Sequence, residues 1–216
     1  MIKAIIFDLD GTIIDSEALS LQAILDCAAK WGVPVTKDEA ATVVGRKWEE
    51  AFDMLFSKHK IPVTRQVATH QVVARFQEIV RKDVVFVPHV KAAIEDFSRH
   101  FRLALVSGSH RADVLWALQK LGVDHLFELV YGAEDYPRSK PNPDGYLKAL
   151  ATMELMPEEC VVFEDSVPGL MSAHAAGIRS VAIGITNHFK HDQSLAQERI
   201  HDYSGVDAAW VKRKFR

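Results

Sequence analysis

The sequence lacks long apolar runs, has few cysteines and carries little net charge. No apolar run approaches the about 18 residues expected of a membrane-spanning helix, and the first run is interrupted by Asp8 and Asp10, too early for a signal-peptide core. A net charge of −3 over 216 residues does not indicate that the protein binds nucleic acid or an acidic membrane surface. The only cysteines, Cys27 and Cys160, lie among apolar residues, which predicts reduced core thiols and a cytoplasmic protein. No obligate protein partner is evident.

Residues 16–81 show helical periodicity and no obvious strand. Asp15 or Ser16 can cap the first of these helices, and Thr36 with Glu39 has the form of a capping box. The stretch predicts a compact bundle of about four helices.

The remainder of the chain alternates between strand and helix patterns. Strands are predicted at 2–7, 103–106, 127–131, 160–163 and 180–184. Alternation of this kind predicts an α/β fold, a doubly wound, Rossmann-like parallel sheet with helices on both faces. We therefore predict a core domain from 1–15 and 82–216, with an inserted α-helical cap domain from 16–81. The polar C-terminal segment is weakly patterned and yields no prediction.

Two carboxylates end the first predicted strand. Asp8 and Asp10 are two positions apart, so both can aim at one spot, and Gly11 lets the backbone turn or approach a ligand closely. Open α/β sheets bind ligands at the carboxyl ends of their strands. The pair therefore predicts a metal and phosphate site at this edge.

Other polar motifs follow later predicted strands or lie in loops at the same edge: 107–109, Lys140-Pro141 and Glu164-Asp165. Hard oxygen ligands of this kind suit Mg²⁺. Without a cation, the carboxylates would repel a phosphate monoester, whereas Mg²⁺ and Lys140 together make its binding possible.

Together the motifs resemble those of the haloacid dehalogenase superfamily. They are Phe-Asp-Leu-Asp-Gly-Thr at 7–12, Ser107, Lys-Pro-Asn-Pro-Asp at 140–144 and Phe-Glu-Asp-Ser-Val-Pro-Gly at 163–169. Within the superfamily, they are similar to those of the branch of small phosphatases and β-phosphoglucomutase that has a helical cap after the first motif. This resemblance implies a Mg²⁺-dependent phosphatase whose partner is a small phosphorylated metabolite, a sugar or polyol phosphate.

The resemblance also implies roles for the acidic residues. Asp8 would attack phosphorus and form an aspartyl-phosphate, while Asp10 would protonate the leaving oxygen and then take a proton from water. Asp8, the backbone carbonyl of Asp10 and Asp165 would hold Mg²⁺, with Glu164 acting directly or through water.

The same resemblance places phosphate-binding groups on two loops. Ser107 and Lys140 would bind the transferring phosphoryl oxygens, and the backbone amides of Gly108 and Ser109 would help at the start of the next helix.

Three residues near or in the cap are ambiguous. Arg46 and Lys47 correspond to a cap loop that faces the site in relatives, so they are candidate substrate contacts; a solvated basic turn explains them too. Asp15 is explained either by helix capping or by a role in the site.

The alternative function is a β-phosphoglucomutase-like isomerase. The mutases carry a histidine five residues beyond the aspartate that matches Asp15, and this sequence has Ser20 there. That difference favours the phosphatase. A catalytically idle binding protein is possible on the same fold, but every catalytic position of the family is present.

Overall fold

The buried apolar run at the start of the chain forms strand β1 (Ala4–Phe7), in the middle of a six-stranded parallel sheet. In the computed structural model, which describes residues 1–43 and 48–216, the strand order is β3-β2-β1-β4-β5-β6. The other strands are β2 (Arg102–Val106), β3 (Leu129–Tyr131), β4 (Cys160–Glu164), β5 (Arg179–Ile183) and β6 (Glu198–Ile200). Because every described pair is parallel, the carboxyl ends of these strands share one edge.

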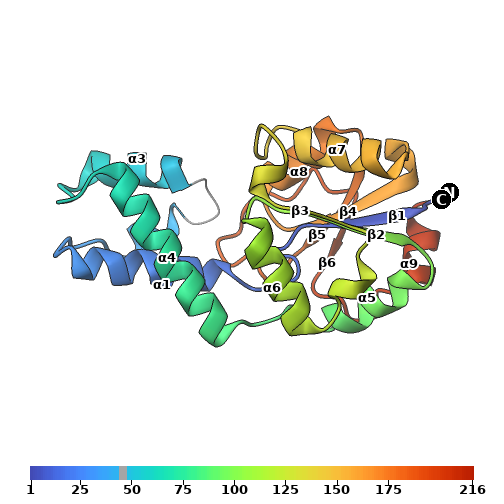
Figure 1. The fold of residues 1–216 in the computed structure, drawn as a ribbon, viewed down its shortest axis with the longest axis horizontal. Coiled ribbons are helices and arrows are strands. Elements are labelled where there is room, and N and C mark those ends of the chain that lie inside the picture. The colour runs from blue at the N-terminus through green and yellow to red at the C-terminus, as the bar shows by residue number, and fades with distance from the viewer. Residues whose placement is uncertain (44–47) are drawn as a thin grey trace. The chain divides into compact units, whose positions relative to one another are not determined.

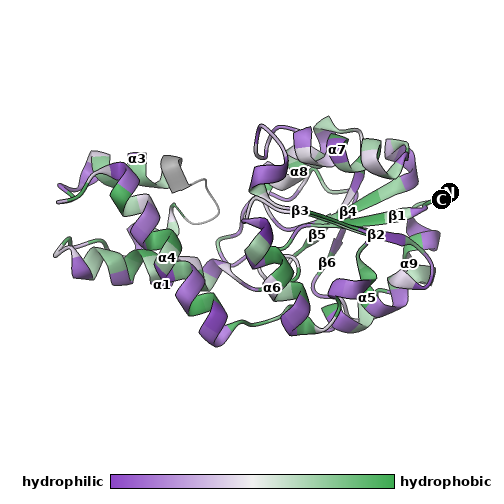
Figure 2. Cartoon of the chain, in the orientation of Figure 1, coloured by the Kyte–Doolittle hydropathy of each residue, from purple (hydrophilic) through white to green (hydrophobic). Residues whose placement is uncertain are grey.

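Helices cover both faces of the sheet. Figure 1 shows α7 and α8 on one face and α5, α6 and α9 on the other. Their bounds are α5 (Val90–Ser98), α6 (Arg111–Leu121), α7 (Asp144–Met153), α8 (Val167–Ala175) and α9 (Ala208–Lys214), with short 3₁₀ turns at Asp124–Leu126, Ala133–Asp135 and Pro157–Glu159. The two central strands, β1 and β4, are hydrophobic along most of their length (Figure 2), as expected of strands buried on both faces.

Alternate side chains of the central strands build two cores. Ile6 belongs to the same buried cluster as Tyr146 of α7. On the opposite face, the rings of Phe7 and Phe163 stack with centroids 5.4 Å apart, and Phe163 stacks on Tyr203 at 5.7 Å. These aromatic contacts fix β1 against β4, the two strands that lead into Asp8 and Glu164.

The predicted α/β parallel sheet with helices is confirmed, and the C-terminal segment contributes more than its sequence indicated. It supplies β6 and α9. Strand β6 is a three-residue strand at the sheet edge with no buried residue, so it lacks an apolar run. The start of α9 is set by Asp207, whose side chain accepts from the N–H of Trp210 (2.7 Å).

The chain separates into two compact units. The sheet unit comprises Met1–Ile14 and Phe86–Arg216, and the helical unit comprises Asp15–Val85. The helices of the latter are α1 (Glu17–Lys30), α2 (Lys37–Ala41), α3 (Trp48–Lys58) and α4 (Arg65–Asp83). In the part of the chain that is described, no helix is both long and apolar enough to cross a membrane.

A local signal sets the start of α2, whereas α1 begins without one. The predicted capping box is confirmed: Thr36 accepts from the Glu39 N–H (3.2 Å), and the Glu39 carboxylate accepts from the Thr36 N–H (3.0 Å). Ser16, rather than Asp15, occupies the N-cap of α1, without a side-chain capping bond.

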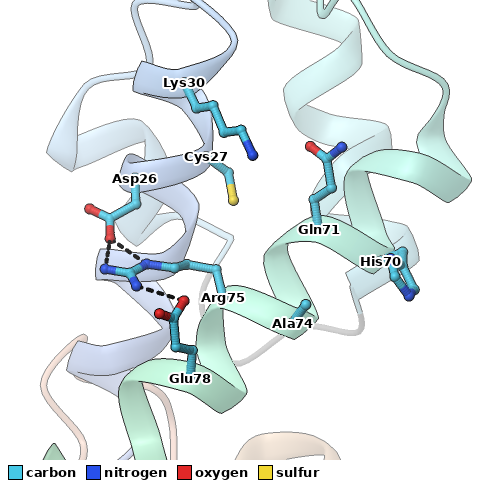
Figure 3. A pocket seen from close by; sticks show the side chains of 8 residues that line it. All are labelled: Asp26, Cys27, Lys30, His70, Gln71, Ala74, Arg75 and Glu78. Carbon is cyan, nitrogen blue, oxygen red and sulfur yellow. Dashed lines mark hydrogen bonds and ion pairs between the residues drawn. The ribbon is translucent and has the colours of Figure 1, made fainter. Parts of the chain in front are cut away.

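A pocket of about 530 Å³ lies between α1 and α4 of the helical unit (Figure 3). Its lining residues are Asp26, Cys27, Lys30, His70, Gln71, Ala74, Arg75 and Glu78. The Arg75 guanidinium pairs with Asp26 at 2.7 Å and with Glu78 at 2.8 Å. The positive charge of Arg75 is therefore already paired with two carboxylates. A cavity that binds phosphate would instead offer a positive charge to the ligand.

The aromatic stack predicts a large effect of truncating its central member. Phe163→Ala should lower the free energy of unfolding by about 3–5 kcal/mol, because Phe163 is fully buried and touches three other rings. Urea unfolding followed by circular dichroism measures this change. The control Leu147→Ala, at a side chain 45% exposed, should change it by less than about 0.5 kcal/mol. Equal effects of the two variants would show that the stack does not hold the sheet together.

Candidate active site at the sheet edge

Asp8 and Asp10 follow β1 in a loop that turns at Gly11. Asp8 extends the strand ladder, since its backbone N–H donates to the Phe163 carbonyl (3.0 Å), and the residue is only 6% exposed. Gly11 has a φ of +77°, and a Cβ there would lie 2.0 Å from Oδ2 of Asp165. Glycine is therefore required both by the backbone conformation and by the close approach of this carboxylate.

Lys140 lies between two of the buried carboxylates. Its Nζ donates to Asp8 Oδ1 and to Glu164 Oε1, both at 2.6 Å, and to the Val106 carbonyl at 3.2 Å. The ammonium thereby connects groups in or directly after β2, β1 and β4, three adjacent strands of the sheet.

Burial and the neighbouring charges shift the pKa values of Asp8 and Lys140. Burial holds the pKa of Asp8 well above its usual range; Lys140 opposes that shift, and Glu164 adds to it. Burial alone would lower the pKa of Lys140, but the attraction of Asp8 and Glu164 outweighs burial and raises it well above the usual value. Lys140 therefore stays protonated and is the positive charge beside Asp8.

The Glu164 carboxylate turns back onto the start of α8. Its Oε2 accepts from the backbone N–H groups of Asp165 (2.9 Å) and Ser166 (3.1 Å) and from the Ser166 hydroxyl (3.0 Å). Its Oε1 accepts from Lys140 and from the Tyr146 hydroxyl (3.2 Å). A fully buried carboxylate is tolerated here because it is hydrogen-bonded on both oxygens and lies at the positive end of a helix.

Three acidic residues of this edge form a group that can hold a metal ion. Among the described residues, Asp8, Glu164 and Asp165 each place one carboxylate oxygen within 4.8 Å of the others, and all three are buried. Three buried carboxylates outnumber the one ammonium of Lys140, so a divalent cation would offset the remaining negative charge. An all-oxygen donor set of this kind fits Mg²⁺.

The loop after β2 brings 107–109 to the same edge. Ser107 is buried, and its carbonyl accepts from the Tyr136 hydroxyl (2.7 Å), whose pKa burial raises to about 12. Ser107 Oγ accepts from the Ser109 N–H (3.0 Å), so in this structure the Ser109 amide bonds within the loop. Gly108 is exposed between them, and the Ser109 hydroxyl donates to Asp10 Oδ2 (2.6 Å).

The structure thus brings together the residues predicted from the four motifs. Two further predicted residues, Arg46 and Lys47, lie outside the described residues, so their substrate contacts stay a prediction. Asp15 belongs to the helical unit, where its N–H donates to the Val85 carbonyl (2.9 Å); its role in the site also stays a prediction.

Two residues that sequence reasoning missed support the site from the C-terminal segment. The buried Gln193 donates through Nε2 to the carbonyls of Asp165 and Ile183, both at 2.7 Å. The buried Thr186 hydroxyl donates to the Gly11 carbonyl (2.6 Å). Each holds the backbone of a residue in or beside the acidic cluster, and no local motif in the sequence marks either one.

The packing of Glu164 against α8 predicts that alanine is not tolerated at Gly169. A Cβ at this helical position would lie 1.7 Å from Glu164 Oε1. Alanine gains about 1 kcal/mol in helix propensity, but displacing Glu164 from Lys140 breaks a buried ion pair worth about 3–5 kcal/mol when one partner is lost. We expect Gly169→Ala to lower the free energy of unfolding by about 2 kcal/mol or more, measured in urea.

The control for that experiment is Ala175→Gly in the same helix, at an exposed position. It should cost at most about 1 kcal/mol, because Ala175 is the last residue of α8 and only helix propensity changes there. A Gly169→Ala protein as stable as wild type would contradict the placement of the Glu164 carboxylate.

Comparison with known proteins agrees with this geometry. The haloacid dehalogenase-like hydrolase family profile matches residues 5–183. The chain is 28% identical over 200 residues to the phosphorylated carbohydrates phosphatase of Thermotoga maritima, with 90% of each chain covered. It is 31% identical over 188 residues to hexitol phosphatase B of Escherichia coli (strain K12), covering 84% of this chain and 83% of that one.

A solved structure shows the same fold. The crystal structure of CbbY from Rhodobacter sphaeroides in complex with phosphate superposes with a TM-score of 0.83, covering 98% of this chain and 100% of that one at 23% identity. The profile match, the relatives and the edge cluster lead to one conclusion: this chain belongs to the haloacid dehalogenase-like hydrolase family.

Proposed function

We propose that this protein is a Mg²⁺-dependent phosphatase that hydrolyses a small phosphate monoester of a sugar or polyol through an aspartyl-phosphate on Asp8. The observation that carries the proposal is the buried group of Asp8, Glu164 and Asp165 with Lys140 between two of them. Its family membership and the relatives named as phosphatases support a phosphoric monoester hydrolase. The names of two relatives, for phosphorylated carbohydrates and for hexitols, support the substrate class.

Mg²⁺, when bound, would neutralise the carboxylates and draw charge from the phosphoryl group. The residues that would hold it are Asp8, Asp165 and the backbone carbonyl of Asp10, with Glu164 direct or through water. Glu164 already accepts bonds on both oxygens, which fits contact through water better than direct ligation.

The first chemical step is assigned to Asp8 and Asp10. A carboxylate oxygen of Asp8 forms a bond to phosphorus while the bond from phosphorus to the leaving oxygen breaks, and Asp10 gives its proton to that oxygen. Lys140 is the positive charge that favours the ionised form of Asp8 for this attack, against the effect of burial. In this proposal, Lys140 and Ser107 also bind the phosphoryl oxygens as charge develops on them.

In the second step, water attacks the phosphorus of the aspartyl-phosphate. Asp10, now ionised, accepts a proton from that water, the bond from phosphorus to Asp8 breaks, and inorganic phosphate is released. Asp8 and Asp10 return to their starting protonation states, so the cycle balances. Because Asp10 acts as acid and then as base, it has to be held in place through both steps.

The division of labour between domains is part of the proposal. The described catalytic candidates all lie in the sheet unit, so the phosphoryl chemistry is assigned to 1–15 and 82–216. Residues 16–81 are assigned the role of a cap that excludes water and selects the leaving group, with Arg46 and Lys47 as candidate contacts.

The position of Ser20 favours a phosphatase over a β-phosphoglucomutase-like isomerase. Ser20 stands where the mutases carry a histidine, and its hydroxyl donates to the carbonyl of Ser16 (3.1 Å), the N-cap of α1. A hydroxyl bonded to its own helix is a weak base and a poor substitute for an imidazole.

Phosphate release tests the proposal. Wild type should release phosphate from p-nitrophenyl phosphate with Mg²⁺ and lose this activity in EDTA. Asp8→Asn should lower kcat by about a thousandfold or more, since the carboxamide does not attack phosphorus. The matched Asp53→Asn variant, at an exposed ion pair of the helical unit, should keep wild-type activity.

Two results would contradict the proposal. One is no phosphate release by wild type across metals and pH; the other is appreciable turnover by Asp8→Asn. With β-glucose 1-phosphate as substrate, glucose 6-phosphate forming faster than free phosphate would indicate the isomerase instead.

A further inference from the structure

Ser109 makes a contact that phosphate binding does not explain. Its hydroxyl donates to Asp10 Oδ2 at 2.6 Å. The two residues follow β1 and β2, which are neighbours in the sheet. The bond therefore connects two loops of the same edge across 99 residues of sequence.

The backbone of Ser109 is fixed on both sides of its side chain. Its N–H donates to Ser107 Oγ (3.0 Å), and its carbonyl accepts from the Ala133 N–H (2.9 Å). A hydroxyl on such a backbone has one free torsion, χ1, so it can hold a partner at a defined place.

Helix capping, the ordinary role of a serine before a helix, does not account for this residue. The N-cap of α6 is His110, and no side-chain capping bond is formed there. The Ser109 hydroxyl is directed instead at Asp10, whose side chain is only partly buried.

A serine hydroxyl suits a carboxyl group that changes its protonation state. It can donate to an ionised carboxylate and accept from a protonated one, whereas an amide N–H or an ammonium only donates. If Asp10 alternates between acid and base, a hydroxyl can remain bonded to it in both steps.

We propose that Ser109 is a positioning residue that holds the Asp10 carboxyl group for proton transfer to and from the reacting oxygens. The inference rests on the proposed function and adds to it a role for the Ser109 side chain, which is distinct from its backbone amide.

The test compares two substrates that differ in how much they need a general acid. p-Nitrophenyl phosphate has a stable leaving anion, and phenyl phosphate has the same ring with a poorer leaving group. The measured quantity is kcat/KM, which reports steps through formation of the aspartyl-phosphate. We expect Ser109→Ala to lower kcat/KM about tenfold with phenyl phosphate and less than about threefold with p-nitrophenyl phosphate.

Two further variants separate positioning from general damage. Ser109→Thr keeps the hydroxyl and should retain most of the activity on phenyl phosphate. Ser98→Ala removes another partly buried serine hydroxyl, bonded to the Glu95 carbonyl (3.0 Å) in α5, and should leave both substrates unchanged. An equal loss on both substrates in Ser109→Ala, or no loss, would overturn the inference while leaving the phosphatase intact.

A crystal structure of Ser109→Ala tests the position of the Asp10 side chain independently of activity. We expect the Asp10 side chain to leave the position it has in wild type, with Asp8 and Lys140 unmoved; an unmoved Asp10 would overturn the inference. Absence of any phosphatase activity in wild type would contradict the proposed function itself, and with it the positioning role of Ser109.

Discussion

The contact of Lys140 with Asp8 and Glu164 is the interaction on which the site depends. It places an ammonium at 2.6 Å from two buried carboxylates that would otherwise repel each other and a phosphate. The arrangement is possible because the parallel strands end at one edge and bring Asp8, the Val106 carbonyl and Glu164 within reach of one side chain. With Asp165 added, the cluster keeps an excess of negative charge that suits a divalent cation.

The parts of the molecule that could be predicted are those with a pattern in a short stretch of the sequence. The apolar runs of β1 and β4 identify central strands, and the acidic residues that follow each of them are marked by their position at a strand end. The sequence predicts Asp8 and Asp165 as site residues in this way, and the family resemblance of their motifs adds Lys140. An apolar run predicts a strand, and the parallel topology brings the residues after such strands to one edge. Neither step requires knowledge of side-chain contacts.

The missed parts depend on contacts between distant segments. Gln193 and Thr186 hold the backbone of Asp165 and Gly11, but each is an ordinary polar residue in a weakly patterned stretch, and only folding brings it to the site. The direction of the Ser109 hydroxyl is similarly a tertiary property, because nothing in Ser-Gly-Ser distinguishes a phosphate ligand from a partner of a carboxylate. A buried polar residue whose bonds are all to distant backbone has no periodicity to reveal it.

The central claim is that phosphoryl transfer passes through Asp8. Its most direct test is rapid acid quench of the enzyme during turnover of p-nitrophenyl phosphate with Mg²⁺, followed by digestion and mass spectrometry of the N-terminal peptide. We predict a phosphoryl group on Asp8 that forms within one turnover and disappears when substrate is exhausted. Steady turnover with no phosphorylated Asp8, or with the phosphoryl group on another residue, would contradict the account.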